Sequence, residues 1–509
     1  MDNYPVLIVV VPLIAALLAG LAVWVEKRLS YPIALTGLAL STFCAVKVLM
    51  QVIATGPIQY KIAGWAPPMG IEYRIDLLNA MVLVIVSGIA CLNLVASFES
   101  VSQETHDRTG AFYSIYCLFV TGLLGVTATG DLFNLYVLIE ITSLSSYAMV
   151  ALGDKDRGPL ASLNYVFIGV IGASFYLLGV GYLYMQTGSL NMADVSLILA
   201  GHQGSSTVLT GFILCMVGLW IKMALFPLHV WLPNAYSYSP VAFSRAVAPL
   251  MTKVMIYVMI RLMITVFGYD YIFKTLHFSD AVVVLASIAI LFGGVMALAQ
   301  KNLKKMLAYI IVCEIGYMVG GAWMGNQLGM TGAILHILND ALMTFAVFLA
   351  VGNMVYKLKN VDLSNLTGIF GKMPWTMAGF VIAAFSIIGV PPTCGFFSKW
   401  YLIMAAFEKG AYHFAAALII SSLICAVLFF RVFEICFFPA VSPDLGESDH
   451  GESGHGELGH GKSDAHSPIQ MEEAPVSMLI VSGLVSLSLI VVGLFSGTIV
   501  NTIILPFLK

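Results

Sequence analysis

The chain has 509 residues, of which 60% are hydrophobic and 10% charged, with a mean hydropathy of +0.93. Soluble domains carry about 25% charged residues, so this composition predicts an integral membrane protein and excludes a soluble enzyme. The formal net charge of -3 lacks the basic surface that nucleic-acid binding requires. The eight cysteines lie singly in apolar runs, so we expect neither an iron–sulfur cluster nor another cofactor in this chain.

Fourteen apolar runs are long enough to cross a bilayer as helices. In chain order they cover 4–25, 32–53, 77–97, 111–129, 132–152, 160–185, 207–229, 240–266, 281–299, 306–325, 329–356, 375–405, 411–438 and 476–505. A shorter amphipathic stretch, 190–199, is expected to lie at the membrane surface between the sixth and seventh runs. The predicted fold class is an all-α integral membrane protein with about 14 transmembrane helices.

The even number of spans places both termini on one side of the membrane. Loops after odd-numbered spans hold twelve Lys and Arg residues, whereas the loops and terminus on the other side hold five. The positive-inside rule therefore predicts a protein of the cytoplasmic membrane with both termini outside and segment 439–475 in the cytoplasm. That segment carries His450, His455 and His460 in a Gly-rich repeat. It is expected to be a flexible linker, and weak Zn or Ni binding by the imidazoles is the alternative.

Basic residues within the spans require an explanation, because a charge at the bilayer centre costs roughly 2.5 to 3.5 kcal/mol. Four of them can snorkel or pair near a span boundary: Lys47, Arg245, Arg261 and Arg431. Lys222 is deeper, five residues before Pro227, and Lys399 follows the break at Gly389–Pro392. Carbonyl groups freed at such breaks are tolerated at membrane depth when they are buried in protein or face water, so the breaks mark candidate ion sites.

The two breaks recur at corresponding positions. The seventh span is fourth in the set 4 to 8, and the twelfth is fourth in the set 9 to 13. Because each set has an odd number of helices, the pattern predicts two inverted five-helix repeats with broken helices 7 and 12. The expected regions are 1–110, 111–266 and 281–438, followed by the loop 439–475 and the last helix in 476–509.

Carboxylates and a histidine complete the set of candidate residues. Glu140 is central in its span and needs a basic partner, for which Lys222 is the natural candidate. An inert structural ion pair is the alternative. Lys253 is also mid-span, and His336 and Asp340 share one face of the eleventh span with Thr344. We expect the lysines Lys222, Lys253 and Lys399 and the histidine His336 to form a protonable line, with Asp340 and Glu314 as secondary candidates.

Several segments resemble the antiporter-like family, which comprises the large subunits of Mrp-type cation/proton antiporters and the proton-pumping membrane subunits of respiratory complex I and membrane-bound hydrogenases. The matching residues lie in segments 130–140, 222–241, 253–254, 304–309 and 389–400, and the resemblance covers roughly 70–435. It implies that Glu140 and Lys222 are the central pair and that Lys253, His336 and Lys399 form the relay. Asp340 and Thr344 stand where the family commonly has a second histidine and a lysine, which alters one relay step.

Segments 130–140 and 188–193 are most similar to the D-type subunit of Mrp antiporters. The first hypothesis is therefore a proton- and cation-translocating subunit of a multi-subunit Na+(K+)/H+ antiporter, with other membrane subunits as partners. The alternative is an ion-pumping arm of a redox-driven complex, a membrane-bound hydrogenase or an NADH-quinone oxidoreductase, with partner redox subunits supplying the energy. A membrane scaffold whose charges serve only stability is a third reading. The residues of the line serve both translocation hypotheses equally.

Overall fold

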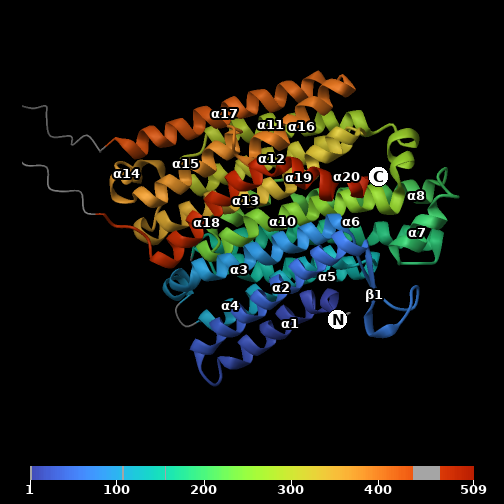
Figure 1. Ribbon diagram of the computed structural model, residues 1–509, viewed down its shortest axis with the longest axis horizontal. Coiled ribbons are helices and arrows are strands. Elements are labelled where there is room, and N and C mark those ends of the chain that lie inside the picture. Colours follow the sequence, from blue (N-terminus) through green and yellow to red (C-terminus); the bar gives the residue numbers. More distant parts are fainter. Residues whose placement is uncertain (1–2, 106–107, 155, 439–470, 509) are drawn as a thin grey trace, which may run out of the picture.

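The computed structural model describes residues 3–105, 108–154, 156–438 and 471–508, and helices dominate it (Figure 1). The N-terminal part contains α1 (Tyr4–Ala22), α2 (Ser30–Thr55), strands β1 (Ile58–Lys61) and β2 (Glu72–Ile75), and α3 (Leu77–Thr105). The next part contains α4 (Thr109–Ala128), α5 (Leu132–Ala151), α6 (Gly158–Thr187), α7 (Met192–Leu199), α8 (Ser206–Met223), α9 (Trp231–Tyr238) and α10 (Val241–Arg261).

The remaining helices follow in the same manner. They are α11 (Ser279–Leu298), α12 (Leu303–Trp323), α13 (Gln327–Leu358), α14 (Ile369–Lys372), α15 (Pro374–Ile388), α16 (Cys394–Lys409), α17 (Tyr412–Phe437), α18 (Val476–Leu494), α19 (Ser496–Ile499) and α20 (Leu505–Leu508). Within the described residues, thirteen helices are long and apolar enough to cross a membrane. The predicted all-α membrane fold is therefore confirmed. The expected twelfth span is divided into α15 and α16, neither of which is long enough to cross alone.

The chain is broken at both predicted positions. Helix α8 ends at Met223, where Ala224 adopts a left-handed conformation with φ of 62°, and α9 begins only at Trp231. Helix α15 ends at Ile388, and Gly389 adopts φ of 94° before α16 begins. A left-handed residue ends a helix because it directs the backbone away from the helical path. The inverted relation between the two five-helix sets remains a prediction.

Three helices form the centre of the bundle. In the most apolar 18 residues of α12 and of α13, 94% of the residues are buried, and the share is 89% for the span that contains α10. In α6 and α17 the same share is only 39%. Every residue of α10 is buried. A helix that is buried on all sides cannot hydrate its charged side chains, so those of α10 must find partners in the protein.

One end of the bundle carries the only strands among the described residues. Strands β1 and β2 pair antiparallel there, with Ile58 opposite Ile75, and α7 packs beside them. Both ends of the chain lie at this end (Figure 1). We call it the hairpin face. The amphipathic stretch predicted at 190–199 forms α7, and its N-cap Asn191 accepts hydrogen bonds from two backbone N–H groups. The predicted histidine cluster His450, His455 and His460 lies outside the described residues.

Candidate translocation site

Glu140 of α5 and Lys222 of α8 form the expected ion pair. Their Oε1 and Nζ atoms are 2.9 Å apart, and Lys222 also donates to Ser143 Oγ at 2.8 Å. The Lys222 side chain is 2% exposed and that of Glu140 is 22% exposed. Ser143 follows Glu140 by three residues and so lies on the same face of α5. The carboxylate compensates the charge of an ammonium that has lost its water.

The break after α8 leaves Lys222 free for this pairing. Backbone carbonyls at a helix end lack intrahelical partners. Here Ile221 O accepts from the indole Nε1 of Trp231 at 3.1 Å and from the backbone N–H of Ala224 at 3.2 Å. Neutral donors therefore occupy the helix end, and the ammonium group one residue further along points to the carboxylate of a neighbouring helix.

Lys253 of α10 pairs with Asp340 of α13 at 2.9 Å between Nζ and Oδ2. Both side chains are buried, and Lys253 also donates to Ala248 O at 3.2 Å. Thr344 donates its hydroxyl to Asp340 Oδ1 at 2.7 Å. Asp340 thus serves as the counter-ion of Lys253. The sequence places Asp340 beside His336 on one helix face, but the contact that the structure shows is with the lysine.

Glu314 of α12 is buried, and its side chain lies within electrostatic range of Asp340. Lys253 and Lys399 are both within electrostatic range of Glu314. The Glu314 side chain therefore lies between two of the predicted relay lysines.

His336 of α13 contacts the second broken helix. Its Nδ1 lies 2.8 Å from Ser398 Oγ on α16, and its Nε2 is buried without a protein partner among the described residues. The ring of Tyr317 lies 5.4 Å from the His336 ring and 5.1 Å from Lys399 Nζ. Tyr317 therefore separates the histidine from the last lysine of the line.

Lys399 of α16 is held by backbone oxygens rather than by a carboxylate. Its Nζ donates to Ile387 O at 2.6 Å, to Ile388 O at 3.2 Å and to Ser422 Oγ at 3.2 Å. The two carbonyls end α15, where the helix dipole is negative. No acidic side chain lies within ion-pair distance of Lys399 in the part of the chain that the structure describes.

The structure thus groups the predicted residues into three clusters. Glu140 joins Lys222, Asp340 joins Lys253 and Glu314, and His336 joins Lys399 through Tyr317. Sequence reasoning missed Ser143, Tyr317 and Ser398, since isolated hydroxyl groups are common in helices. Their spacing from charged residues was the available signal for Ser143 and Ser398, which lie three residues after Glu140 and one before Lys399.

Buried charged residues beside broken helices within a membrane bundle are typical of ion-translocating membrane proteins. Residues 128–425 match the family model described as NADH:quinone oxidoreductase/Mrp antiporter, TM. The chain belongs to this family, as the resemblance predicted.

Individual relatives match most of the chain. It is 40% identical to NADH-quinone oxidoreductase subunit N of Desulforudis audaxviator over 99% of this chain and 98% of that protein. It is 30% identical to the D-type subunit of the Na(+)/H(+) antiporter of Alkalihalophilus pseudofirmus over 86% of this chain and 87% of that protein. Its structure is similar to a chain of the membrane-bound sulfane sulfur reductase, an archaeal respiratory membrane complex, with a TM-score of 0.87, 28% identity and coverage of 98% and 96%.

Proposed function

We propose that this protein translocates protons, in exchange for or together with a monovalent cation, as one membrane subunit of a multi-subunit complex. The observation that supports this function best is the buried pair of Lys222 and Glu140 beside a break in the same span. A proton or cation that binds the carboxylate weakens the pair and changes the charge felt by the next lysine. The clusters around Lys253 and Lys399 supply the following steps.

Orientation follows from the charges in the loops. The hairpin face carries the side with five Lys and Arg residues, so we place it outside the cytoplasm together with both termini. The opposite ends of the helices then face the cytoplasm. In this orientation the line of charged residues lies within the membrane, and Lys222 and Lys399 are on its two broken spans.

The energy source distinguishes two candidates. The Mrp-type antiporter is supported by the match to segments 130–140 and 188–193 and by the relative from Alkalihalophilus pseudofirmus. In that case the proton gradient drives Na+ or K+ out. The redox-driven complex is supported by the relative named NADH-quinone oxidoreductase subunit N, which matches nearly the whole chain. In that case partner subunits that carry electrons supply the energy.

The variant Lys222→Ala tests the translocation role. In everted membrane vesicles that contain the assembled complex, we expect it to abolish ion transport, because the carboxylate of Glu140 loses its partner. Lys47→Ala is the matched control, since Lys47 lies within α2 with an exposed side chain and no contact with the line. Transport that survives Lys222→Ala in an assembled complex would remove this lysine from the mechanism.

A second experiment identifies the complex. The chain is tagged after Lys509, native membranes are solubilised gently, and co-purifying proteins are identified by mass spectrometry. Small hydrophobic subunits with a second large antiporter-like chain would indicate the antiporter. Iron–sulfur, nickel or flavin subunits would indicate the redox-driven complex.

A further inference from the structure

A pocket of about 350 Å³ opens on the hairpin face, away from the three clusters described above. Its wall is built from β2, the turn between α4 and α5, the start of α7 and the end of α10. Hydrogen bonds fix these parts together, from Gly130 N to Glu72 O at 2.9 Å and from Asn191 Nδ2 to Glu72 Oε1 at 2.9 Å. The pocket is thus lined by hydrogen-bonded parts of the chain, and Glu72, Asp76 and Arg261 are among its charged lining residues.

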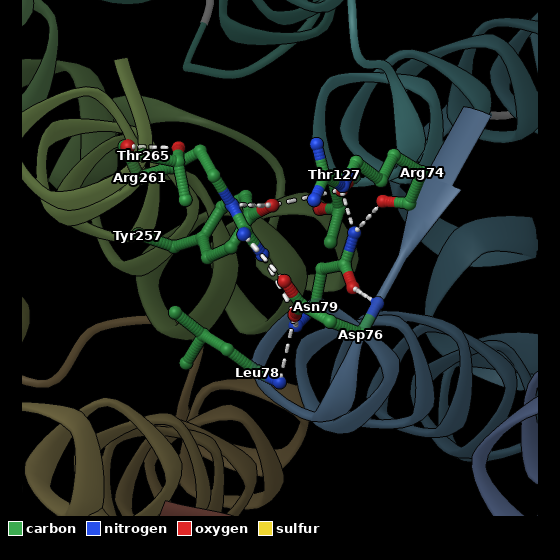
Figure 2. Close-up of polar contacts among 8 residues, drawn as sticks. All are labelled: Arg74, Asp76, Leu78, Asn79, Thr127, Tyr257, Arg261 and Thr265. Carbon is green, nitrogen blue, oxygen red and sulfur yellow. Dashed lines mark hydrogen bonds and ion pairs between the residues drawn. The ribbon is translucent and has the colours of Figure 1, made fainter. Parts of the chain in front are cut away.

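Two residues that line this pocket, Asp76 and Arg261, form an ion pair. Figure 2 shows this pair. Arg261, the last residue of α10, donates through Nη1 to Asp76 Oδ2 at 2.6 Å and through Nη2 to Asp76 Oδ1 at 2.9 Å. Two parallel bonds between a guanidinium and a carboxylate give the strongest geometry for such a pair. Burial raises the pKa of Asp76, but Arg261 and the backbone donors outweigh it, so the pKa of this carboxyl is lowered and the pair stays charged.

Asp76 also caps the start of α3. Its Oδ1 accepts from Leu78 N at 3.1 Å and from Asn79 N at 3.3 Å, while its own N–H donates to Asn79 Oδ1 at 2.7 Å. Asparagine caps a helix about as well as aspartate does. The charge of Asp76 can therefore be removed without removing the cap, which separates its electrostatic role from its structural role.

Arg261 continues a buried polar stripe that starts at the second cluster. Lys253, Tyr257 and Arg261 are spaced by four residues along α10 and share one face. The backbone of Arg261 is therefore about 12 Å further along the helix than that of Lys253, because each residue of an α-helix adds about 1.5 Å. Tyr257 accepts a hydrogen bond from Arg261 Nε at 3.2 Å and donates to Thr127 O at 3.0 Å (Figure 2). The stripe therefore runs along one face of α10 from the Lys253–Asp340 pair to Arg261 in the pocket wall.

Two aromatic rings beside Arg261 can stabilise its guanidinium when the guanidinium leaves Asp76. The rings of Tyr257 and of Phe507 in α20 each lie 5.4 Å from the guanidinium carbon. Such cation–π contacts stabilise a cation that lacks a full hydration shell. The helix also widens directly after Arg261 into a π-helical stretch, η4 (Leu262–Phe267), a feature found frequently at functional sites.

We propose that Asp76 and Arg261 form a gate between the pocket on the hairpin face and the Lys253 end of the buried line, and that opening this pair admits water and protons to Tyr257. This inference rests on the proposed function, because a gate needs an ion path behind it. A pair that only fastens α3 to α10 is the alternative. The gate gives the first five-helix set its own access to the hairpin face.

A reporter cysteine behind the pair tests the gate. In membranes that contain the assembled complex, Tyr257→Cys is treated from the hairpin face with a membrane-impermeant thiol reagent, and the wild-type chain gives the background of the native cysteines. When Asp76→Asn is combined with Tyr257→Cys, the labelling rate should rise about tenfold. The loss of one charged hydrogen bond shifts the equilibrium between closed and open pair by about this factor. Ser196→Cys in the pocket wall should be labelled with or without Asp76→Asn.

Asp131→Asn is the matched control. Asp131 caps α5 by accepting from Asn134 N at 2.7 Å, and no basic side chain pairs with it among the described residues. The Asp131→Asn variant should leave the labelling of Tyr257→Cys unchanged. Equal labelling with and without Asp76→Asn would overturn the gate, and so would an equal rise in both aspartate variants. If Asp76→Asn prevents assembly, Arg261→Lys, which keeps one bond of the pair, should raise labelling to a smaller extent.

This readout separates the gate from the proposed function. Labelling reports the opening of the Asp76–Arg261 pair whether or not ions move, whereas Lys222→Ala reports transport. Unchanged labelling together with lost transport in Lys222→Ala would reject the gate and keep the translocation role.

Discussion

The two broken spans differ in the groups that pair with the buried lysine and with the carbonyls at the helix end. After α8, neutral N–H groups of Trp231 and Ala224 donate to a carbonyl at the helix end, and the ammonium of Lys222 pairs with the carboxylate of Glu140. After α15, the ammonium of Lys399 itself satisfies the carbonyls of Ile387 and Ile388. A carboxylate can be neutralised by a proton, whereas carbonyl dipoles are fixed. The comparison indicates that a proton can neutralise the partner of Lys222 but not the carbonyl partners of Lys399.

The largest expected effect comes from separating the charges at the first break. Glu140→Gln should destabilise the complex by about 3 kcal/mol, because the buried ammonium of Lys222 loses its counter-ion. Adding Lys222→Met should restore most of the stability but none of the transport. Thermal unfolding of the solubilised complex and ion flux in vesicles measure the two properties. A double variant with restored transport would mean that the pair is only structural.

A smaller effect is expected where two acids share one base. Asp340→Asn leaves Glu314 beside Lys253 as a replacement counter-ion, so the loss of stability should be about 1 to 2 kcal/mol. The double variant with Glu314→Gln should lose more than the sum of the two single variants, by roughly 0.5 to 3 kcal/mol. Glu434→Gln, an exposed carboxylate on α17, is the control. Additive losses would show that the two acids act independently.

The smallest expected effect is a difference of about 1 kcal/mol between the donors at the two breaks. Lys399→Met removes charged bonds to two carbonyls and should cost about 2 kcal/mol, whereas Trp231→Phe removes one neutral bond and should cost about 1 kcal/mol. Thermal unfolding ranks them. The reverse order would contradict the view that the charged bonds of Lys399 stabilise the second helix end more than the neutral bond of Trp231 stabilises the first.

The membrane class, most of the spans, both breaks and the identity of the charged residues could be predicted from the order of the amino acids. Hydropathy and helix-breaking residues act locally, so they can be read in one dimension. The pair of Glu140 and Lys222 was also predictable, because each is an isolated charge deep in its own span and needs an opposite charge.

The partners of the other charges depend on how the helices pack. Asp340 could pair with His336 on its own helix, yet the packing of α10 against α13 places it within ion-pair distance of Lys253. Arg261 had a boundary position that snorkelling explained equally well, and its partner Asp76 lies 185 residues earlier in the chain. Buried charges select partners by distance in the folded bundle, and that distance is set by the packing of helices rather than by sequence spacing.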